Sequence, residues 1–433
     1  MKGAKEQEQR ATSALLAVMQ VVPSFGKAVL RFLDAPSGRI SCFVEPRFLS
    51  DEGETVVPDG MVVVEKGKTR WVCLVEVKTG ASALHAQQVE RYLRIAGREG
   101  FHALLTVSNQ IVPAPSESPV TVRRPLVRKV VLRHLSWFRI LTEAVVEKEH
   151  RGVEDREQAK VLADLIAFME DERSGASGYE GMGASWVGVR EAANQGLLSP
   201  ATQGVREVAE NWQQFLQYLS LQLRQDLGRP VTQIFSKGSD PRSRLAADAK
   251  TLGTDGRLEG SLKVPNAIAP IVVEADLGKL RVTTRLKVPA TREGRPKTRI
   301  NWLLRQLPDA PGDLRVEVHY PHARQTPLAA IAEARINPEA LLLPGDPKRA
   351  PLSFDLALTR PMGTKRGKSP GSFVAATANQ VHEFYGSVVQ HLRVQRPVHP
   401  PRLPKDPGKP IDHTAVTPDA REDAPEATPP PLP

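Results

Sequence analysis

Apolar residues recur at helical spacing near the start of the chain and then crowd into short runs typical of strands. Residues 8–33 place apolar side chains three and four apart, with a break around Pro23, which predicts two short helices. Valine-rich runs bounded by glycine, aspartate or charged residues then predict three strands, at 40–45, 60–65 and 71–78. The last two runs are separated by a short turn and are expected to form a hairpin.

The pattern next becomes amphipathic and then apolar again. Residues 82–99 predict a helix with Ser82 as N-cap and Gly100 as its stop, and a fourth strand follows at 102–107. Residues 126–149 predict one more strand or helix. The order helix, strand, strand, strand, helix, strand is typical of an α/β fold, so a mixed sheet flanked by helices is expected over residues 1–150.

The remaining pattern divides the chain into three further parts. Residues 151–229 predict a helical connector, with helices at 154–170 and 205–227 and a Gly- and Ser-rich linker at 174–183. Strand-like runs and a closing helix at 376–394 predict a β-rich α+β domain over 230–395, and the Pro-rich residues 396–433 predict a disordered tail. The strand-like runs lie at 231–235, 258–264, 271–275, 280–288 and 314–320.

Composition narrows the class of protein. The chain of 433 residues is long enough for two or three domains, and no run approaches the roughly 18 apolar residues of a membrane helix. The polar start, with Met1 followed by Lys2, lacks the apolar core of an export signal, so a cytoplasmic location is expected. Cys42 and Cys73 lie in apolar runs, which indicates buried thiols and excludes a cysteine zinc cluster. Any metal ion must therefore bind oxygen ligands.

Charge points to a polyanionic partner. The formal net charge is +10 and the isoelectric point is about 9.6. Residues 230–395 hold 25 lysines and arginines against 15 acidic residues, an excess of ten that equals the excess of the whole chain. Nucleic acid is the first candidate, because basic proteins attract it through long-range electrostatics.

The candidate chemistry lies on the predicted hairpin. Asp59 follows Pro58 at the start of the second strand, and the third strand carries Glu76, Val77 and Lys78. Glu76 and Lys78 are two residues apart and point to the same face, so the ammonium can position or deprotonate a water beside the carboxylate. Asp59 and Glu76 offer the oxygen ligands that Mg²⁺ or Mn²⁺ prefers.

The helix at 82–99 adds two further candidates. Gln88 and Tyr92 are four residues apart and share a helical face, from which they can orient a metal ligand, the water or the substrate. Gln87 is the alternative to Gln88 for the inward position.

Together these residues resemble the PD-(D/E)XK nuclease superfamily, in particular its RecB- and Cas4-like branch. The resemblance covers about residues 5–110 and implies a restriction-endonuclease-like αβββαβ core. It implies that Asp59 and Glu76 bind the metal, that Lys78 is the catalytic lysine, and that Gln88 and Tyr92 form the helix motif.

In such nucleases a glutamate on the first helix often completes the metal site. Glu8 resembles that glutamate, and Glu45 at the end of the first strand is a rival third carboxylate. The resemblance does not extend to the C-terminal half.

A basic stretch in the C-terminal half is the candidate nucleic-acid contact. Nine lysines and arginines and a single acid lie between Lys279 and Arg305, with residues 292–299 expected in a loop. Such a set would contact phosphates without reading sequence, whereas a solvated basic face is the plain alternative. The candidates are Arg281, Arg285, Arg292, Arg295, Lys297 and Arg299.

The sequence therefore predicts a Mg²⁺- or Mn²⁺-dependent nuclease that hydrolyses DNA, in preference to RNA. The resemblance implies a role in prokaryotic phage defence or in repair. The alternatives are an RNA-cleaving effector, and a nucleic-acid-binding or interaction protein whose nuclease-like core is structural. The C-terminal domain is expected to present substrate, sense a ligand, or dock a partner protein or a second copy of the chain.

Overall fold

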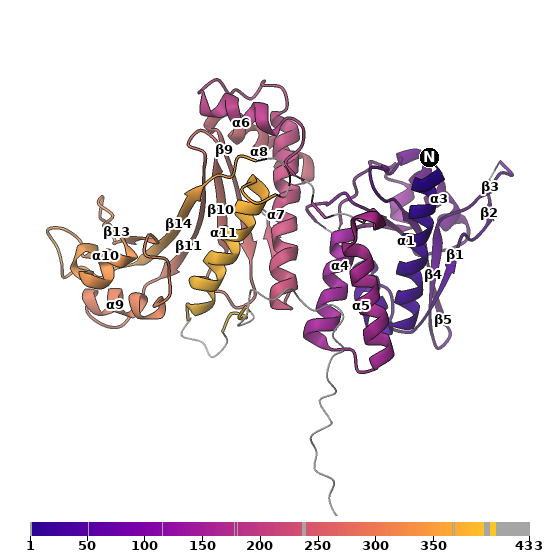
Figure 1. Cartoon of the computed structure of the whole chain (residues 1–433), viewed down its shortest axis with the longest axis horizontal. Coiled ribbons are helices and arrows are strands. Elements are labelled where there is room, and N and C mark those ends of the chain that lie inside the picture. Colours follow the sequence, from indigo (N-terminus) through magenta and orange to yellow (C-terminus); the bar gives the residue numbers. More distant parts are fainter. Residues whose placement is uncertain are drawn as a thin grey trace, which may run out of the picture.

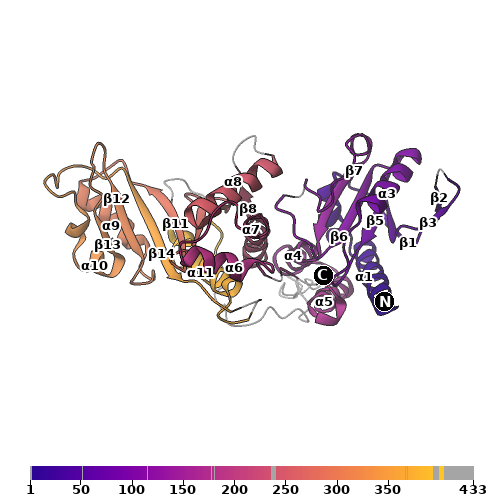
Figure 2. The same ribbon diagram turned by 90° about the horizontal axis from the view of Figure 1, so that it is seen from above.

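The computed structural model describes residues 2–50, 52–114, 116–176, 178–179, 181–235, 240–365, 367, 369–393 and 399–403. Figure 1 shows two layered halves side by side, the first in indigo and purple and the second in salmon to yellow. Helix α4 (Trp137–Val145) of the first half faces helix α7 (Val205–Leu227) of the second, which Figure 2 shows from above. The two halves meet along this helix pair.

The first half is built on a mixed sheet. In the described residues five strands follow the order β1-β4-β5-β6-β7; β1, β4 and β5 are antiparallel, and β5, β6 and β7 are parallel. The strands are β1 (Arg39–Val44), β4 (Gly60–Lys66), β5 (Thr69–Val77), β6 (Ala103–Ser108) and β7 (Val131–Ser136), with β2 (Phe48–Leu49) and β3 (Thr55–Val56) as a separate short pair.

Helices cover both faces of this sheet, which explains why its central strands read as continuous apolar runs. Side chains of β5 alternate: Cys73 and Val75 join one core with the first helices, whereas Leu74 joins the core under α3. One face is covered by α1 (Lys2–Val21), α2 (Pro23–Leu30), α4 and α5 (Arg156–Glu170), and the other by α3 (Ala86–Arg98).

Three local expectations need correction. The first helix, α1, begins at Lys2 and not at residue 8. Its first turns are polar, so the apolar pattern did not reveal this start. Helix α3 is preceded by His85, and Ser82 instead donates its backbone N–H to the carbonyl of Thr79 in a turn. Residues 126–149 form both a strand and a helix, β7 and α4, with a short turn η2 (Leu126–Arg128) before them.

The second half is built on an antiparallel sheet. Within the described ranges seven strands follow the order β13-β12-β14-β11-β10-β9-β8. Buried and exposed residues alternate along β11, so one face packs on the core and the other meets solvent. The strands are β8 (Thr232–Ile234), β9 (Arg257–Lys263), β10 (Ile271–Asp276), β11 (Arg281–Pro289), β12 (Arg315–His319), β13 (Leu328–Ala330) and β14 (Ser353–Pro361).

Helices supply the rest of the second core. Trp212 and Phe215 of α7 are fully buried against the sheet and the last helix. The other helices are α6 (Trp186–Asn194), α8 (Pro241–Asp255), α9 (Pro296–Gln306), α10 (Ile331–Ile336) and α11 (Phe373–Ser387). Shorter helical turns of the second half lie at η5 (Pro338–Leu341) and η6 (Val389–His391), and those of the first half at η1 (Arg31–Leu33), η3 (Val146–Arg151) and η4 (Glu172–Ser174).

The segment expected to be a linker carries core residues. Tyr179 and Met182 are buried in the core of the second half, where Tyr179 donates its hydroxyl hydrogen to the carbonyl of Asn211 at 3.0 Å. Within the expected connector, α5 packs in the first core and α7 in the second.

Part of the expected tail is ordered. Residues 399–403 contact α11 and the turn that follows it: the Tyr385 hydroxyl bonds to the carbonyl of Pro401, and the Leu403 backbone N–H donates to Gln390 at 2.9 Å. Residues 396–398 and 404–433 of that tail lie outside the described residues.

Among the helices described, none is by itself long and apolar enough to span a membrane. The segments Gly3–Val21 and Pro23–Leu33 pass the length and composition test only as a pair, bent by 112°. Their apolar side chains, including Leu15 and Met19, are buried in the first core.

Candidate active site

The hairpin brings the two predicted carboxylates together. Gly60 pairs with Val75 across β4 and β5, so Asp59 lies opposite Glu76 at the open end of the hairpin. One carboxylate oxygen of Asp59, Oδ2, accepts a hydrogen bond from the backbone N–H of Val77 at 2.7 Å. This bond fixes the Asp59 side chain against the strand that carries Glu76.

Lys78 joins these carboxylates to the first helix. Its Nζ lies 2.8 Å from Oε1 of Glu76 and 3.4 Å from Oε2 of Glu8. Glu76 is fully buried, while the side chains of Lys78 and Glu8 are 13% and 15% exposed. The ammonium thus sits between a strand carboxylate and a helix carboxylate in a largely water-excluded place.

Burial dominates the electrostatics of this cluster. It raises the pKa of Glu76 to about 8, and the nearby charge of Asp59 adds to the effect while Lys78 opposes it. Burial also raises the pKa of Asp59 above its ordinary range, against the bond from the Val77 amide. For Lys78 burial alone would lower the pKa, but Glu76, Asp59 and Glu8 together raise it. Lys78 is therefore protonated at neutral pH.

Gln88 and Tyr92 face this cluster from α3. Gln88 Nε2 donates to the Tyr92 hydroxyl at 3.0 Å, and that hydroxyl donates to the carbonyl of Val57 at 3.4 Å. Burial, followed by the charge of Glu76, raises the pKa of Tyr92. Gln87 is exposed, so Gln88 takes the inward position.

Geometry separates the two rival third carboxylates. Glu8 contacts the ammonium of Lys78, as described above. Glu45 is exposed, and its Oε1 accepts a hydrogen bond from Gln9 at 2.6 Å. Glu8 is thus the helix carboxylate in contact with the cluster.

The donor atoms suit a hard cation. No group of three or more His, Cys, Asp or Glu within the described part of the chain is arranged to hold a metal ion. Asp59 and Glu76 nevertheless present only oxygen donors, and neither buried oxygen of Glu76 has a hydrogen-bond donor of good geometry among the described residues. Buried Glu76 and half-buried Asp59 lie opposite each other and offer only oxygen donors, which fits Mg²⁺ or Mn²⁺ in donor chemistry.

Several residues that the sequence pattern did not single out fasten the end of β5. The indole Nε1–H of Trp137 donates to the carbonyl of Lys78 at 2.9 Å, and the Asn109 side chain donates to the carbonyl of Gly80 at 3.0 Å. Thr79 donates its hydroxyl hydrogen to Gln7 at 3.3 Å. Asn109 directly follows β6, and Trp137 directly follows β7. Their position at the carboxyl ends of parallel strands, beside the end of β5, is the sequence signal that could have indicated their role.

A cavity of about 630 Å³ begins beside this strand end. Its walls include Gly80 and Ser82 from the first half and Tyr179, Trp186 and Phe373 from the second. The carboxylates themselves are not part of its wall. Gly80 follows Lys78 by two residues, which limits their Cα separation to about 7.6 Å.

The basic candidates of the second half are partly neutralised. Arg285 lies 2.6 Å from Glu259, and Lys297 lies 2.8 Å from Glu339. Arg299 donates to the carbonyl of Gly294 at 3.0 Å, so its guanidinium is bound to the backbone of the loop before the helix at 296–306. Arg281, Arg292, Arg295 and Lys297 are exposed.

Residues 292–299 are not all loop. Helix α9 begins at Pro296, so Lys297 and Arg299 lie on its first turn. Proline at the first helical position is a recognised start signal, because its missing N–H would have no partner there.

No protein-family model, curated protein or solved structure matches this chain.

Proposed function

We propose that the protein is a metal-dependent nuclease that hydrolyses phosphodiester bonds of DNA. The observation that carries the proposal is the contact of buried Glu76 with Lys78 and its position opposite Asp59 on a hairpin. Helices before and after the hairpin add Glu8, Gln88 and Tyr92, in the order expected of a restriction-endonuclease-like core.

The residues divide the chemistry among them. Asp59 and Glu76 would hold Mg²⁺ or Mn²⁺, which when bound neutralises charge that develops on the phosphate. Lys78, protonated at neutral pH, orients the attacking water or stabilises the phosphate rather than removing a proton. Glu8 restrains the ammonium, and Tyr92 and Gln88 restrain the position of the helix against the hairpin.

The experiment compares substrates and variants of the full chain. Single- and double-stranded DNA and RNA are incubated with the protein, with Mg²⁺ and with a chelator. Glu76→Ala and Lys78→Ala are each matched to an exposed residue of the same hairpin, Glu65→Ala and Lys66→Ala.

We expect DNA cleavage that requires the metal ion, is lost at least 100-fold in the two site variants, and is unchanged in the two controls. Cleavage that survives in both site variants overturns the site assignment. Preferential cleavage of RNA identifies the RNA-cleaving alternative, and metal-independent, salt-sensitive binding without cleavage identifies the non-catalytic one.

A further inference from the structure

A second cavity, of about 490 Å³, lies where the two halves meet. Its wall includes four arginines: Arg31 and Arg151 beside the first helices, Arg139 on α4, and Arg224 on α7. No acidic side chain belongs to the wall among the described residues. The cavity is therefore strongly positive and receives side chains from both halves.

The carboxylates of this region lie outside the wall. Glu143 contacts three of the arginines: Arg224 at 2.7 Å, Arg31 at 3.6 Å and Arg139 at 4.0 Å. Glu147 pairs with Arg151. Two carboxylates thus face four guanidinium groups, which leaves an excess of two positive charges around the cavity.

Burial makes that excess costly. The side chains of Arg139 and Arg224 are only 12% and 7% exposed. Burial lowers the pKa of Arg139 to about 10, with Glu143 opposing and Arg224 adding to the effect. The Nε–H of buried Arg224 has no hydrogen-bond acceptor among the described residues. Charges held out of water are costly unless they are paired with opposite charges. Here two carboxylates pair with four arginines, so the compensation is incomplete.

The guanidinium groups are held in place on the wall. Arg139 lies 5.4 Å and Arg31 5.9 Å from the ring centroid of Phe32, within cation–π range. Arg224 donates to Glu143 across 81 residues of sequence. The arginines are thus positioned before any ligand arrives, which lowers the entropic cost of binding one.

We propose that this cavity binds a phosphate-bearing anion. Guanidinium forks match phosphate oxygens with paired, charge-assisted hydrogen bonds, and the unmatched charge gives the anion its affinity. Because Arg224 belongs to the second half and Arg139 to the first, the bound anion contacts both. The site is separate from the Glu76 cluster and independent of the proposed nuclease activity.

The test is calorimetric titration of the full chain in metal-free buffer without phosphate. Three probes separate the sources of the phosphate: inorganic pyrophosphate, ATP, and a short oligothymidylate with a 5′-phosphate or a 5′-hydroxyl. The variant is Arg31→Gln, whose side chain is 55% exposed and 3.6 Å from Glu143. The matched control is Arg94→Gln, whose side chain is 45% exposed and 3.6 Å from Glu90.

We expect saturable binding of at least one probe, weakened tenfold or more by Arg31→Gln and also by Arg151→Gln, and unchanged by Arg94→Gln. A requirement for the 5′-phosphate on the oligonucleotide identifies a strand end as the source, whereas binding of ATP or pyrophosphate identifies a free phosphate compound. Absence of saturable binding of all three probes, or equal weakening by Arg31→Gln and Arg94→Gln, overturns the proposal. Because no metal or cleavage is involved, failure of the nuclease proposal leaves this result unaffected.

Discussion

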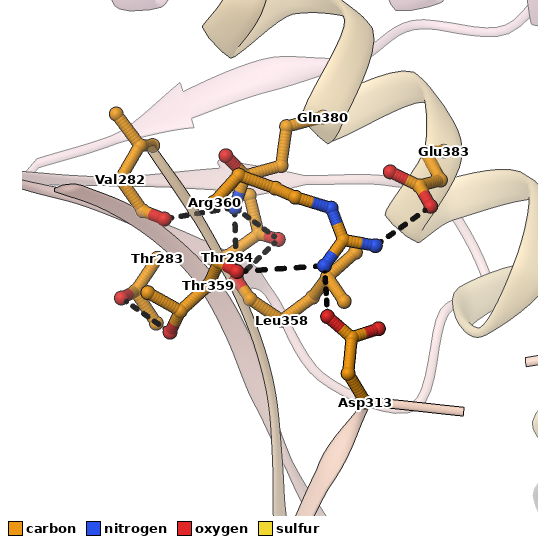
Figure 3. A network of polar contacts seen from close by, with 9 residues as sticks. All are labelled: Val282, Thr283, Thr284, Asp313, Leu358, Thr359, Arg360, Gln380 and Glu383. Carbon is orange, nitrogen blue, oxygen red and sulfur yellow. Dashed lines mark hydrogen bonds and ion pairs between the residues drawn. The ribbon is translucent and has the colours of Figure 1, made fainter. Parts of the chain in front are cut away.

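Each half of the molecule buries polar side chains against a sheet, but the two halves differ in how these side chains are hydrogen-bonded. In the second half, Gln380 of α11 donates to the carbonyls of Val282 and Leu358 at 3.0 and 2.8 Å, as Figure 3 shows. In the first half, both carboxylate oxygens of Glu76 lack a hydrogen-bond donor of good geometry among the described residues. The buried amide is matched by carbonyls, whereas the partner of the buried carboxylate is the ammonium of Lys78 at 2.8 Å.

The same contrast holds for the charged groups nearby. Arg360 is part-exposed and bridges two exposed carboxylates, Asp313 and Glu383, with Glu383 at 3.0 Å, so these charges neutralise one another at the surface (Figure 3). Around Glu76, the single ammonium of Lys78 faces three carboxylates. Satisfied polar networks stabilise a fold, whereas acidic groups crowded around one ammonium favour binding of a cation.

Gln380→Ala should produce the largest loss of stability. It removes the side-chain donor to two buried carbonyls, although Thr284 still donates to that of Leu358 at 3.4 Å, and it opens a cavity under α11. The free energy of unfolding should fall by about 3 kcal/mol. Asn379→Ala, at the exposed neighbouring position, is the control and should cost less than about 1 kcal/mol. Urea denaturation measures both. Equal effects of the two changes would show that the Gln380 bonds contribute nothing specific.

His134 should make the first half sensitive to acid. It is buried on β7, contacts Thr106 Oγ1 at 3.0 Å and the carbonyl of Gln110 at 2.8 Å, and burial lowers its pKa to about 4. The unfolded chain binds this proton near pH 6.5 and the folded chain only near pH 4, so stability falls as the pH drops between these values, by up to about 3 kcal/mol. In His134→Gln this part of the pH dependence, measured by denaturation at several pH values, should disappear. A variant that keeps the full slope would assign it to other groups.

Glu76→Gln should raise stability while it abolishes cleavage. The pKa of Glu76 is about 8 in the folded chain and ordinary in the unfolded chain, so ionisation at pH 7 favours the unfolded state. The amide cannot ionise, so the free energy of unfolding at pH 7 in metal-free buffer should rise by about 1 to 2 kcal/mol. Thermal denaturation beside the cleavage assay measures both. A variant that loses stability would identify Glu76 as a structural residue.

Arg285→Gln should have the smallest effect. Arg285 and Glu259 are 41% and 51% exposed, and an exposed pair contributes less than about 0.5 kcal/mol. Because Glu259 already neutralises Arg285, DNA association at moderate salt should also be unchanged. Filter binding at several salt concentrations measures the DNA association. A clearly reduced salt dependence would show that Arg285 contacts nucleic acid.

Much of the fold was predictable because its signals are local. The helix at Val205–Leu227 has the boundaries that its apolar face predicts, and the hairpin of β4 and β5 follows from valine-rich runs around a turn. The start of α1 and the true N-terminus of α3 were not predictable from this pattern, since polar turns and loops carry no apolar periodicity. Spacing alone was enough to expect Asp59 opposite Glu76.

The sequence by itself determined which chemical groups this protein has and which of them are neighbours on one strand or helix, such as Glu76 and Lys78. Only the tertiary structure decided which distant groups meet: Glu8 rather than Glu45 at Lys78, and Arg224 with Glu143 in the arginine-lined cavity. The physical reason is that electrostatic energy depends on distance and burial. Both quantities arise when helices pack on the sheets, and neither can be read from spacing along the chain.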